Sequence, residues 1–275
     1  SSCLDETTAT RGQLHQMRDQ EGAARAVCDW SETARDAETA YALVDRAFGE
    51  FATARPRPKH ISVTINTLEA RADAAPAPPA EIKTGLHLDF QLMTMIEDRL
   101  KIAKKPLFII GGGGKRGNIF DIVRKAGALV MTTYAGRGAY DGKDERCLGA
   151  YLARPSSADI IAQADLIVVV GSELSEVDLW RDELGHSCDM IRVDIDPEML
   201  AQARAGDMPV LGDAAAVLQA MAVAIPTRVD DQAPHWEAAK VAATKARWRS
   251  EVMTERPGIV EVAEALKAVL PDDCM

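Results

Sequence analysis

The sequence predicts an α/β fold built on a doubly wound parallel sheet. Short runs rich in Val, Ile and Leu alternate with helical patterns between residues 85 and 226. Continuous apolar strands separated by helices are typical of a parallel sheet that is covered on both faces. The chain of 275 residues is 47% hydrophobic, which is enough for a substantial core, and its length allows one or two domains.

Residues 1–70 are predicted to belong to a first α/β unit. A helical pattern runs through residues 36–54, where Leu43, Ala47 and Phe51 recur at helical spacing. A run of β-branched residues predicts a strand at 61–66. Residues 71–84 are rich in Pro and Ala, which predicts an extended and exposed linker.

Residues 85–226 are predicted to form a central domain in which strands and helices alternate. Short apolar runs indicate the strands, and apolar residues at helical spacing indicate the helices. The predicted strands are 106–111, 129–133, 165–171, 190–196 and 208–212, and the predicted helices are 88–103, 117–127, 156–164, 197–204 and 214–225.

Residues 227–275 are predicted to form a linker helix and the start of a further domain. A long amphipathic helix at 236–253 places Val241, Trp248 and Val252 along one face. The helix and turn after it carry Leu266 and Val269, which need an apolar partner. The sequence also lacks an initial Met and a signal-peptide pattern. We therefore expect an internal piece of a longer protein, with partial α/β segments on both sides of the central domain.

The charge balance excludes some classes of partner. With 42 acidic and 32 basic residues, the formal net charge is -10. An acidic surface repels phosphate backbones, so no nucleic-acid partner is expected. No apolar run is long enough to span a bilayer, so no membrane partner is expected either. The scattered cysteines show no CxxC spacing, which predicts a reducing cytoplasm without a disulfide framework or a zinc site.

The glycine run at 111–114 is the main candidate for a ligand site. Gly112, Gly114 and Gly117 fit the GxGxxG pattern between a predicted strand and a predicted helix. Glycine there lets the backbone approach a pyrophosphate, and the helix N-terminus offers unpaired amides. However, Thr133 stands where an acidic residue usually binds the ribose. Two readings stay open: a nucleotide site, or glycines that only permit a tight turn and close packing.

Other polar residues follow strands that are predicted to end at the same edge of the sheet. Gly171, Ser172 and Glu173 come at the end of one strand. Asp194 and Asp196 end the next strand, where we expect helix-capping and turn roles rather than metal ligation. The histidines show no ligand spacing, and no GxSxG, HExxH or P-loop motif occurs. The sequence therefore predicts no metal site and no nucleophile–base pair.

The order of several segments resembles a known family. The stretch "RPRPKHISVTINTLEA" is similar to the end of the first domain of thiamine-diphosphate enzymes of the acetolactate synthase and 2-oxo-acid decarboxylase family. The stretch "RPGIVEVAEALKAVLPDD" resembles the opening helix of the third domain. Landmarks of the Rossmann-like central domain are matched in order by "PLFIIGGGG", "LVMTTYAGRGAYD", "DLIVVVGSEL", "IRVDID" and "VLGDA".

This resemblance implies thiamine diphosphate and Mg²⁺ as cofactors of the full-length protein. The family's catalytic Glu lies early in the first domain and its magnesium-binding motif in the third. Both are expected outside this chain, which alone would be inactive. The segment that contains His15 and Gln16 resembles one that approaches a neighbouring subunit's active site, so both are candidates for the thiamine-diphosphate vicinity. The family also implies a homodimer or homotetramer, because its active sites form between two subunits.

The resemblance also raises FAD as a cofactor. In acetolactate synthases a glycine loop of the central domain faces the flavin diphosphate. Those enzymes commonly carry Gly-x-Arg-Phe at the third strand end, whereas this sequence has Glu173 at the arginine position. An anion there cannot neutralise phosphate charge, which argues against FAD. The candidate nucleotide-binding residues are Gly111, Gly112, Gly113, Gly114, Thr133 and Gly171.

These departures favour a decarboxylase of a small 2-oxo acid, which cleaves the C–C bond next to the carbonyl group with loss of CO₂. The opening "SSCLDETTATRGQLHQMRDQ" resembles the branch that decarboxylates 5-guanidino-2-oxopentanoate. One alternative is an acetolactate synthase or another carboligase, a transferase, with FAD in the central domain. A second alternative is a non-catalytic nucleotide-binding domain.

Overall fold

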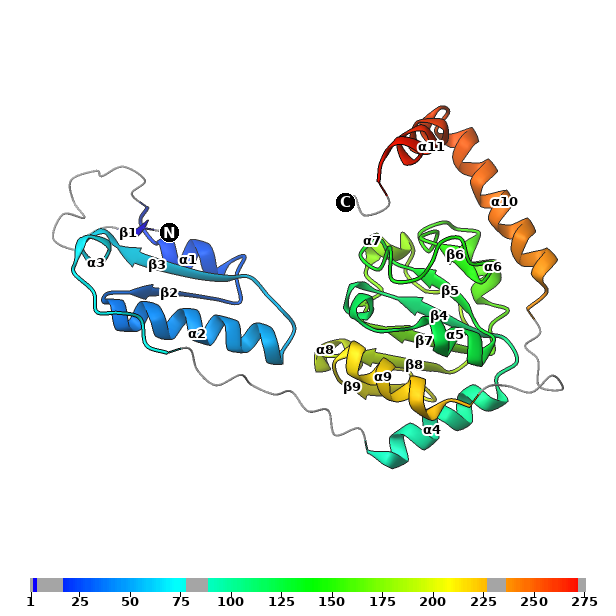
Figure 1. Cartoon of the computed structure of the whole chain (residues 1–275), viewed down its shortest axis with the longest axis horizontal. Helices are drawn as coiled ribbons and strands as arrows, with labels where there is room; N and C mark the ends of the chain where they lie inside the picture. Colours follow the sequence, from blue (N-terminus) through cyan, green and yellow to red (C-terminus); the bar gives the residue numbers. More distant parts are fainter. Residues whose placement is uncertain (1, 4–16, 78–88, 227–235, 272–275) are drawn as a thin grey trace. The chain divides into compact units, whose positions relative to one another are not determined.

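The computed structural model describes residues 2–3, 17–77, 89–226 and 236–271. The chain divides into two compact units, Ser1–Gly85 and Leu86–Met275 (Figure 1). The finer domain boundaries that composition suggests stay predictions. None of the described helices combines the length and the apolar character that crossing a bilayer requires.

The first unit is built on a small parallel sheet. β2 (Trp30–Ala34) pairs with β3 (Lys59–Thr64), and β1 (Ser2–Cys3) pairs with the other side of β3. The strand predicted at 61–66 is therefore confirmed in part, but it begins and ends two residues earlier. It ends at Thr64 because the hydroxyl of that residue accepts a hydrogen bond from the amide of Thr67, 3.1 Å away, and caps a short helix.

Three described helices accompany this sheet. α1 (Gln20–Arg25) precedes β2, α2 (Ala37–Thr53) connects β2 to β3, and α3 (Ile65–Glu69) follows β3. The helix predicted for 36–54 is confirmed by α2. The carboxylate of Asp36 accepts a hydrogen bond from the amide of Thr39 at 2.7 Å, which starts the helix at the predicted place.

The second unit contains a six-stranded parallel sheet in the order β6-β5-β4-β7-β8-β9, which can be followed in Figure 1. It confirms the predicted doubly wound architecture. The predicted strands are all present, and β6 is an edge strand that the apolar pattern did not indicate. The strands are β4 (Pro106–Ile110), β5 (Leu129–Thr132), β6 (Cys147–Gly149), β7 (Leu166–Val170), β8 (Met190–Asp194) and β9 (Met208–Leu211).

Alternate residues of the buried strands supply two separate cores. In β4, Phe108 and Ile110 belong to an apolar cluster to which α4 (Phe90–Ile102), α5 (Phe120–Ala126) and α9 (Ala214–Ala224) also contribute. Leu107 and Ile109 belong to a second cluster, with residues of α6, α7 and α10. These four side chains are fully buried, which explains why the strand is apolar at every position.

The predicted helices of the second unit are present in the predicted order with some differences in length, and α7 is an additional helix in a segment predicted as a loop. Two of them, α6 and α8, are shorter than the predicted 156–164 and 197–204. After α8 the chain turns, and Asp207 accepts a hydrogen bond from the amide of Arg204 at 2.8 Å. The helices are α4 (Phe90–Ile102), α5 (Phe120–Ala126), α6 (Ser157–Ile161), α7 (Glu176–Leu179), α8 (Pro197–Leu200), α9 (Ala214–Ala224), α10 (Ala238–Glu255) and α11 (Ile259–Val269).

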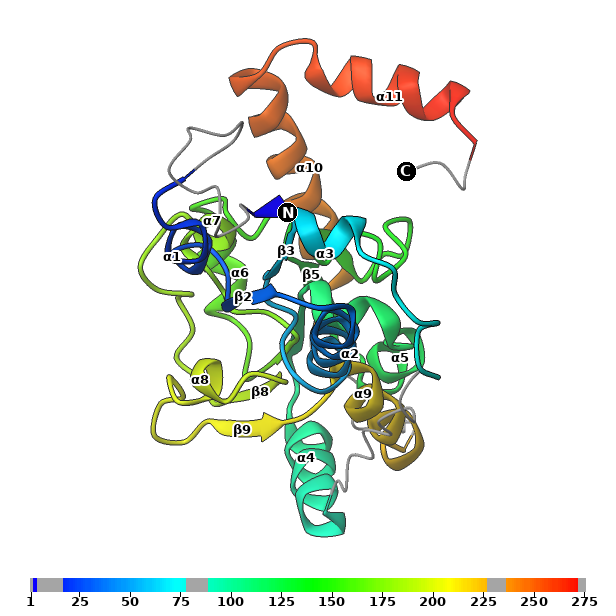
Figure 2. The same cartoon turned by 90° about the vertical axis from the view of Figure 1, so that its left-hand side faces the viewer.

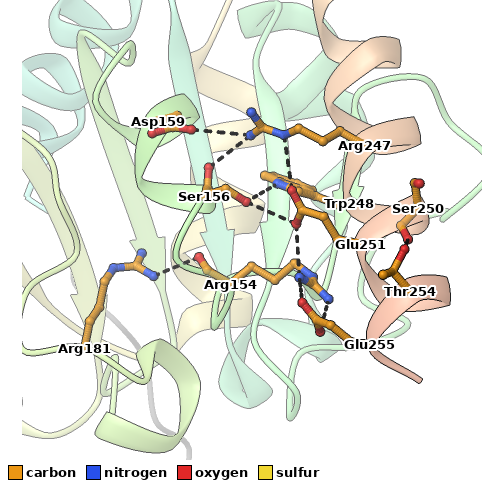
Figure 3. A network of polar contacts seen from close by, with 10 residues as sticks. All are labelled: Arg154, Ser156, Asp159, Arg181, Arg247, Trp248, Ser250, Glu251, Thr254 and Glu255. Atoms are coloured by element: carbon orange, nitrogen blue, oxygen red, sulfur yellow. Dashed lines mark hydrogen bonds and ion pairs between the residues drawn. The ribbon is translucent and has the colours of Figure 1, made fainter. Parts of the chain in front are cut away.

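Helix α10 is fastened to the sheet through its C-terminal half (Figure 3). Trp248 is fully buried in the second core and stacks on Tyr151, with ring centroids 5.3 Å apart. Its indole N–H donates a hydrogen bond to the hydroxyl of Ser156 at 3.0 Å. A large aromatic side chain with a satisfied polar group gives this half of the helix a specific anchor.

Charged side chains reinforce the same contact. Arg154 forms ion pairs with Glu251 at 3.0 Å and with Glu255 at 2.8 Å (Figure 3). Arg247 reaches Asp159 at 3.4 Å. Helix α11 then turns at an angle to α10 (Figures 1 and 2) and exposes most of its apolar side chains.

Candidate functional site

The strand order of the second unit creates a topological switch point between β4 and β7. From β4 the chain proceeds to β5 and β6 on one side, and it then returns to β7, β8 and β9 on the other. In such sheets ligands bind beyond the carboxyl ends of the two central strands, where the connections diverge. Gly111 follows β4 and Gly171 follows β7, so the structure brings the two predicted glycine segments to this point.

The two glycine segments pack directly on each other. The amide of Gly111 donates to the carbonyl of Val170 at 2.9 Å, and the amide of Gly113 donates to the carbonyl of Gly171 at 3.1 Å. A Cβ on Gly111 would lie 2.1 Å from the carbonyl oxygen of Gly171. Gly171 has φ of +59° and lies so close that its own Cβ would be 2.7 Å from the Cα of Gly113. Side chains are excluded here by the opposing backbone.

The loop after β5 closes on the same strand end. The amide of Thr133 donates to the carbonyl of Ile110 at 3.0 Å, and the hydroxyl of Thr133 accepts from the amide of Gly136 at 3.1 Å. A Cβ on Gly136 would lie 1.9 Å from the same carbonyl oxygen. Thr133 is buried, so its side chain holds the loop in place.

The helix after the glycine loop differs from the prediction. Gly112–Arg116 form a 3₁₀ turn, and α5 begins only at Phe120, three residues after the predicted start. No larger residue fits at position 117, because a Cβ on Gly117 would lie 2.5 Å from the side chain of Leu218 in α9. The amide of Phe120 is bound by the side chain of Asn118 at 3.2 Å. The loop therefore does not provide the helix N-terminus that the GxGxxG reading requires.

Two charged residues lie at this edge: Glu173, which the sequence analysis singled out, and Arg192, which it did not. Glu173 is exposed, as an acidic residue at a strand end is expected to be. Arg192 of β8 is 6% exposed, and its guanidinium donates to the carbonyl of Glu173 at 2.8 Å. Burial lowers the pKa of Arg192, and the carboxylate of Asp194 counteracts this effect. Sequence reasoning did not single out Arg192, although an arginine within the apolar run at 190–194 is a signal of a buried charge near this edge.

The two aspartates after β8 have the structural roles that the sequence predicted. Asp194 accepts a hydrogen bond from the amide of Asp196 at 2.9 Å, which forms a turn. Asp196 accepts from the amide of Glu198 at 3.0 Å and caps α8. No group of three or more His, Cys, Asp or Glu side chains suited to a metal ion occurs among the described residues.

Most glycine amides at this edge are not available to the diphosphate of FAD or of another nucleotide. The amides of Gly111, Gly113, Gly114 and Gly117 all donate to carbonyl groups of the protein. An exposed carboxylate, Glu173, lies on the rim. A phosphate cradle is built from free backbone amides, and four of the five glycine amides of this loop are already used within the protein. The packing reading of the glycines is therefore the one that the geometry supports.

Helix order, strand order and interlocked glycine loops define a doubly wound α/β domain with the topology of nucleotide-binding domains. Residues 94–221 match the family model described as "Thiamine pyrophosphate enzyme, central domain". The matched residues thus carry the central domain of thiamine pyrophosphate enzymes, as the order of the sequence segments predicted.

Similar proteins agree with this assignment. "Probable 2-ketoarginine decarboxylase AruI" of Pseudomonas aeruginosa is 31% identical over 95% of this chain and 47% of its own length. An acetolactate synthase of Arthrospira platensis is 26% identical over 64% of this chain and 33% of its own length. The chain thus spans less than half the length of these relatives. An X-ray structure of a protein of Mycobacterium smegmatis assigned as thiamin diphosphate-dependent has the same fold, with a TM-score of 0.62, 22% identity, and coverage of 80% of this chain and 43% of that one.

Proposed function

We propose that the protein containing this chain is a thiamine-diphosphate-dependent 2-oxo-acid decarboxylase. The observation that carries the proposal is the similarity to a 2-ketoarginine decarboxylase along 95% of the chain. The first unit and the linker helix take part in that similarity, whereas the similarity to the acetolactate synthase of Arthrospira platensis covers 64% of the chain. The proposed substrate is 5-guanidino-2-oxopentanoate, which loses CO₂ and yields 4-guanidinobutanal.

The chemistry of the site supports a decarboxylase over a flavin-containing carboligase. Acetolactate synthases of the family hold FAD in the central domain, and the amides of Gly111, Gly113 and Gly114 are already bound to the protein here. The chemistry that thiamine diphosphate supplies when bound is an electron sink for the pair left after CO₂ departs. Thiamine diphosphate and Mg²⁺ would be held by parts of the protein outside this chain.

The role proposed for this chain is mainly structural. Its central domain would separate and orient the catalytic domains, and the chain alone would be inactive. We assign the boundaries 1–70, 71–84, 85–226 and 227–275 to the end of the first domain, a linker, the central domain, and the linker helix with the start of the third domain. His15 and Gln16, the proposed contacts of thiamine diphosphate, lie outside the described residues. A cytoplasmic homodimer or homotetramer completes the proposal.

The test uses the full-length gene product with thiamine diphosphate and Mg²⁺. CO₂ release and product identity are measured with 5-guanidino-2-oxopentanoate and, separately, with pyruvate. Formation of 4-guanidinobutanal supports the proposed decarboxylase. Formation of acetolactate from pyruvate, with flavin retained on the purified protein, would instead indicate a carboligase. Absence of turnover with any 2-oxo acid would contradict an enzymatic role and favour a non-catalytic domain.

A further inference from the structure

The two halves of α10 pack very differently. The C-terminal half carries the buried Trp248 and the ion pairs to Arg154. The N-terminal half presents mostly small side chains, and Ala239 and Ala242 line a cavity of about 580 Å³. Val241 is buried in the second core, but the neighbouring alanines cannot fill the space between the helix and the sheet edge, so a cavity remains beside them.

The walls of this cavity are largely apolar. Leu129, the first residue of β5, forms one side, and the indole of Trp236 forms another. The position of Trp236 is fixed, because its N–H donates to the carbonyl of Pro106 at 2.9 Å. Leu129 and Pro106 both begin strands, so the cavity lies at the amino-terminal edge of the sheet, opposite to the glycine loops.

Two cations and one carboxylate line the cavity, and a second carboxylate, Asp144, lies beside Arg146. Lys245 and Arg146 line it together with a single carboxylate, Glu145. Arg146 lies 3.6 Å from Glu145 and 3.7 Å from Asp144, so its ion pairs are long. The ammonium of Lys245 lies 3.3 Å from the carbonyl of Asp144. An ammonium has three donors and a guanidinium five, so both cations keep donors for a bound anion.

We propose that this cavity is a binding site for a small monocarboxylate with an aromatic body. The aromatic ring would lie against Trp236 and the alanines of α10, and the carboxylate would lie at the mouth beside Lys245 and Arg146. Volume and lining match those of small-molecule sites, which are mostly apolar with a few polar groups. The site does not depend on the proposed decarboxylase activity, because it lies at the other edge of the sheet.

The experiment is a calorimetric titration of this chain with 2-naphthoate and with its uncharged analogue 2-naphthamide. Ala242→Phe fills the proposed site, and Ala243→Phe adds the same group on the face of α10 that lines a different cavity. We expect saturable binding of one 2-naphthoate, weakened at least tenfold (~1.4 kcal/mol) by Ala242→Phe and less than about twofold by Ala243→Phe. Ala239→Leu is a second filling variant if Ala242→Phe unfolds the protein.

The charge contribution is tested separately. Lys245→Gln should weaken 2-naphthoate about fivefold and leave 2-naphthamide unchanged, because only the carboxylate interacts with the ammonium. The matched control is Lys240→Gln, which removes a lysine that lines the other cavity. Absence of saturable binding by the unsubstituted chain would overturn the proposal. Equal weakening by Ala242→Phe and Ala243→Phe would overturn it as well.

Discussion

The amide of Gly113 donates a hydrogen bond to the carbonyl of Gly171, 3.1 Å away, and so joins the ends of β4 and β7 at the switch point of the sheet. The contact is possible only because neither residue has a side chain. It occupies the place beyond the strand ends where a ligand binds in related topologies. The glycines therefore lock two strand ends together by backbone contact.

Replacing Gly171 by Ala should destabilise the second unit. The Cβ would lie 2.7 Å from the Cα of Gly113, and φ of +59° is unfavourable for a residue with a side chain. We expect a loss of about 2–4 kcal/mol in the free energy of unfolding, measured by urea denaturation. Gly142→Ala is the control, since no atom lies within 4 Å of its Cβ position and its φ is not positive. Equal stabilities of the two variants would contradict the proposed lock.

The edge should not bind a nucleotide, and the reason can be tested. We expect calorimetric titrations of the chain with FAD, ADP and NAD to show no saturable binding up to about 1 mM. Glu173→Gln removes the exposed carboxylate but leaves the amides bonded within the loops. This variant should therefore bind no nucleotide either. Binding by Glu173→Gln alone would show that charge, rather than the occupied amides, excludes the ligand, and binding by the unsubstituted chain would restore the FAD alternative.

The sequence allowed most of the sheet to be predicted because β4, β5 and β7 are buried and almost entirely apolar on both faces. The runs that include Phe108 in β4 and Val168 in β7 predicted covered strands, and the glycines after them marked the edge where loops converge. Neighbouring residues determined these features. Local patterns of this kind could also identify the caps at Asp36 and Asp196.

The rest of the site depends on contacts between residues that are distant in sequence. No local pattern shows that the amide of Gly113 would be used by Gly171 rather than by a phosphate. Likewise, no local pattern shows that Leu218 of α9 lies against Gly117 and leaves no room there for a side chain. The sequence could therefore predict where a site would form, but the availability of its hydrogen-bond donors required the structure.

Trp248 should be the principal anchor of α10. Trp248→Ala removes a fully buried side chain together with its hydrogen bond to Ser156. We expect a loss of about 3–5 kcal/mol in the free energy of unfolding, measured by urea denaturation. Trp180→Ala is the control, because Trp180 is 73% exposed, and it should change stability by less than about 0.5 kcal/mol. If Trp248→Ala destabilised the chain less than Trp180→Ala does, the ion pairs of Arg154 would suffice to hold α10 in place.

The first unit contains a group that should make its stability depend on pH. Hydrogen bonds from Lys59 and from the indole of Trp30 lower the pKa of Glu50 from 4.5 to about 2. The donor atoms lie 2.7 Å and 2.8 Å from the carboxylate. Burial acts to lower the pKa of Lys59, but its hydrogen bonds to Asp29 and Glu50 outweigh this and raise it. Lys59 thus remains charged beside Glu50 throughout the acidic range.

A carboxylate with a lowered pKa stabilises the folded state above its unfolded pKa and loses that contribution as pH falls through the folded value. Glu50 should therefore contribute fully above about pH 4.5 and progressively less down to about pH 2. Glu50→Gln should cost about 1 kcal/mol at pH 7, since partial exposure screens the pair, and should flatten the pH dependence in that window. The measurement is urea unfolding followed by the ¹⁹F signal of 5-fluorotryptophan at Trp30. The control is Glu69→Gln, which changes an exposed carboxylate in α3 and should leave both the stability and its pH dependence unchanged. If Glu50→Gln and the unsubstituted chain lost stability identically as pH falls, the assignment to Glu50 would be refuted.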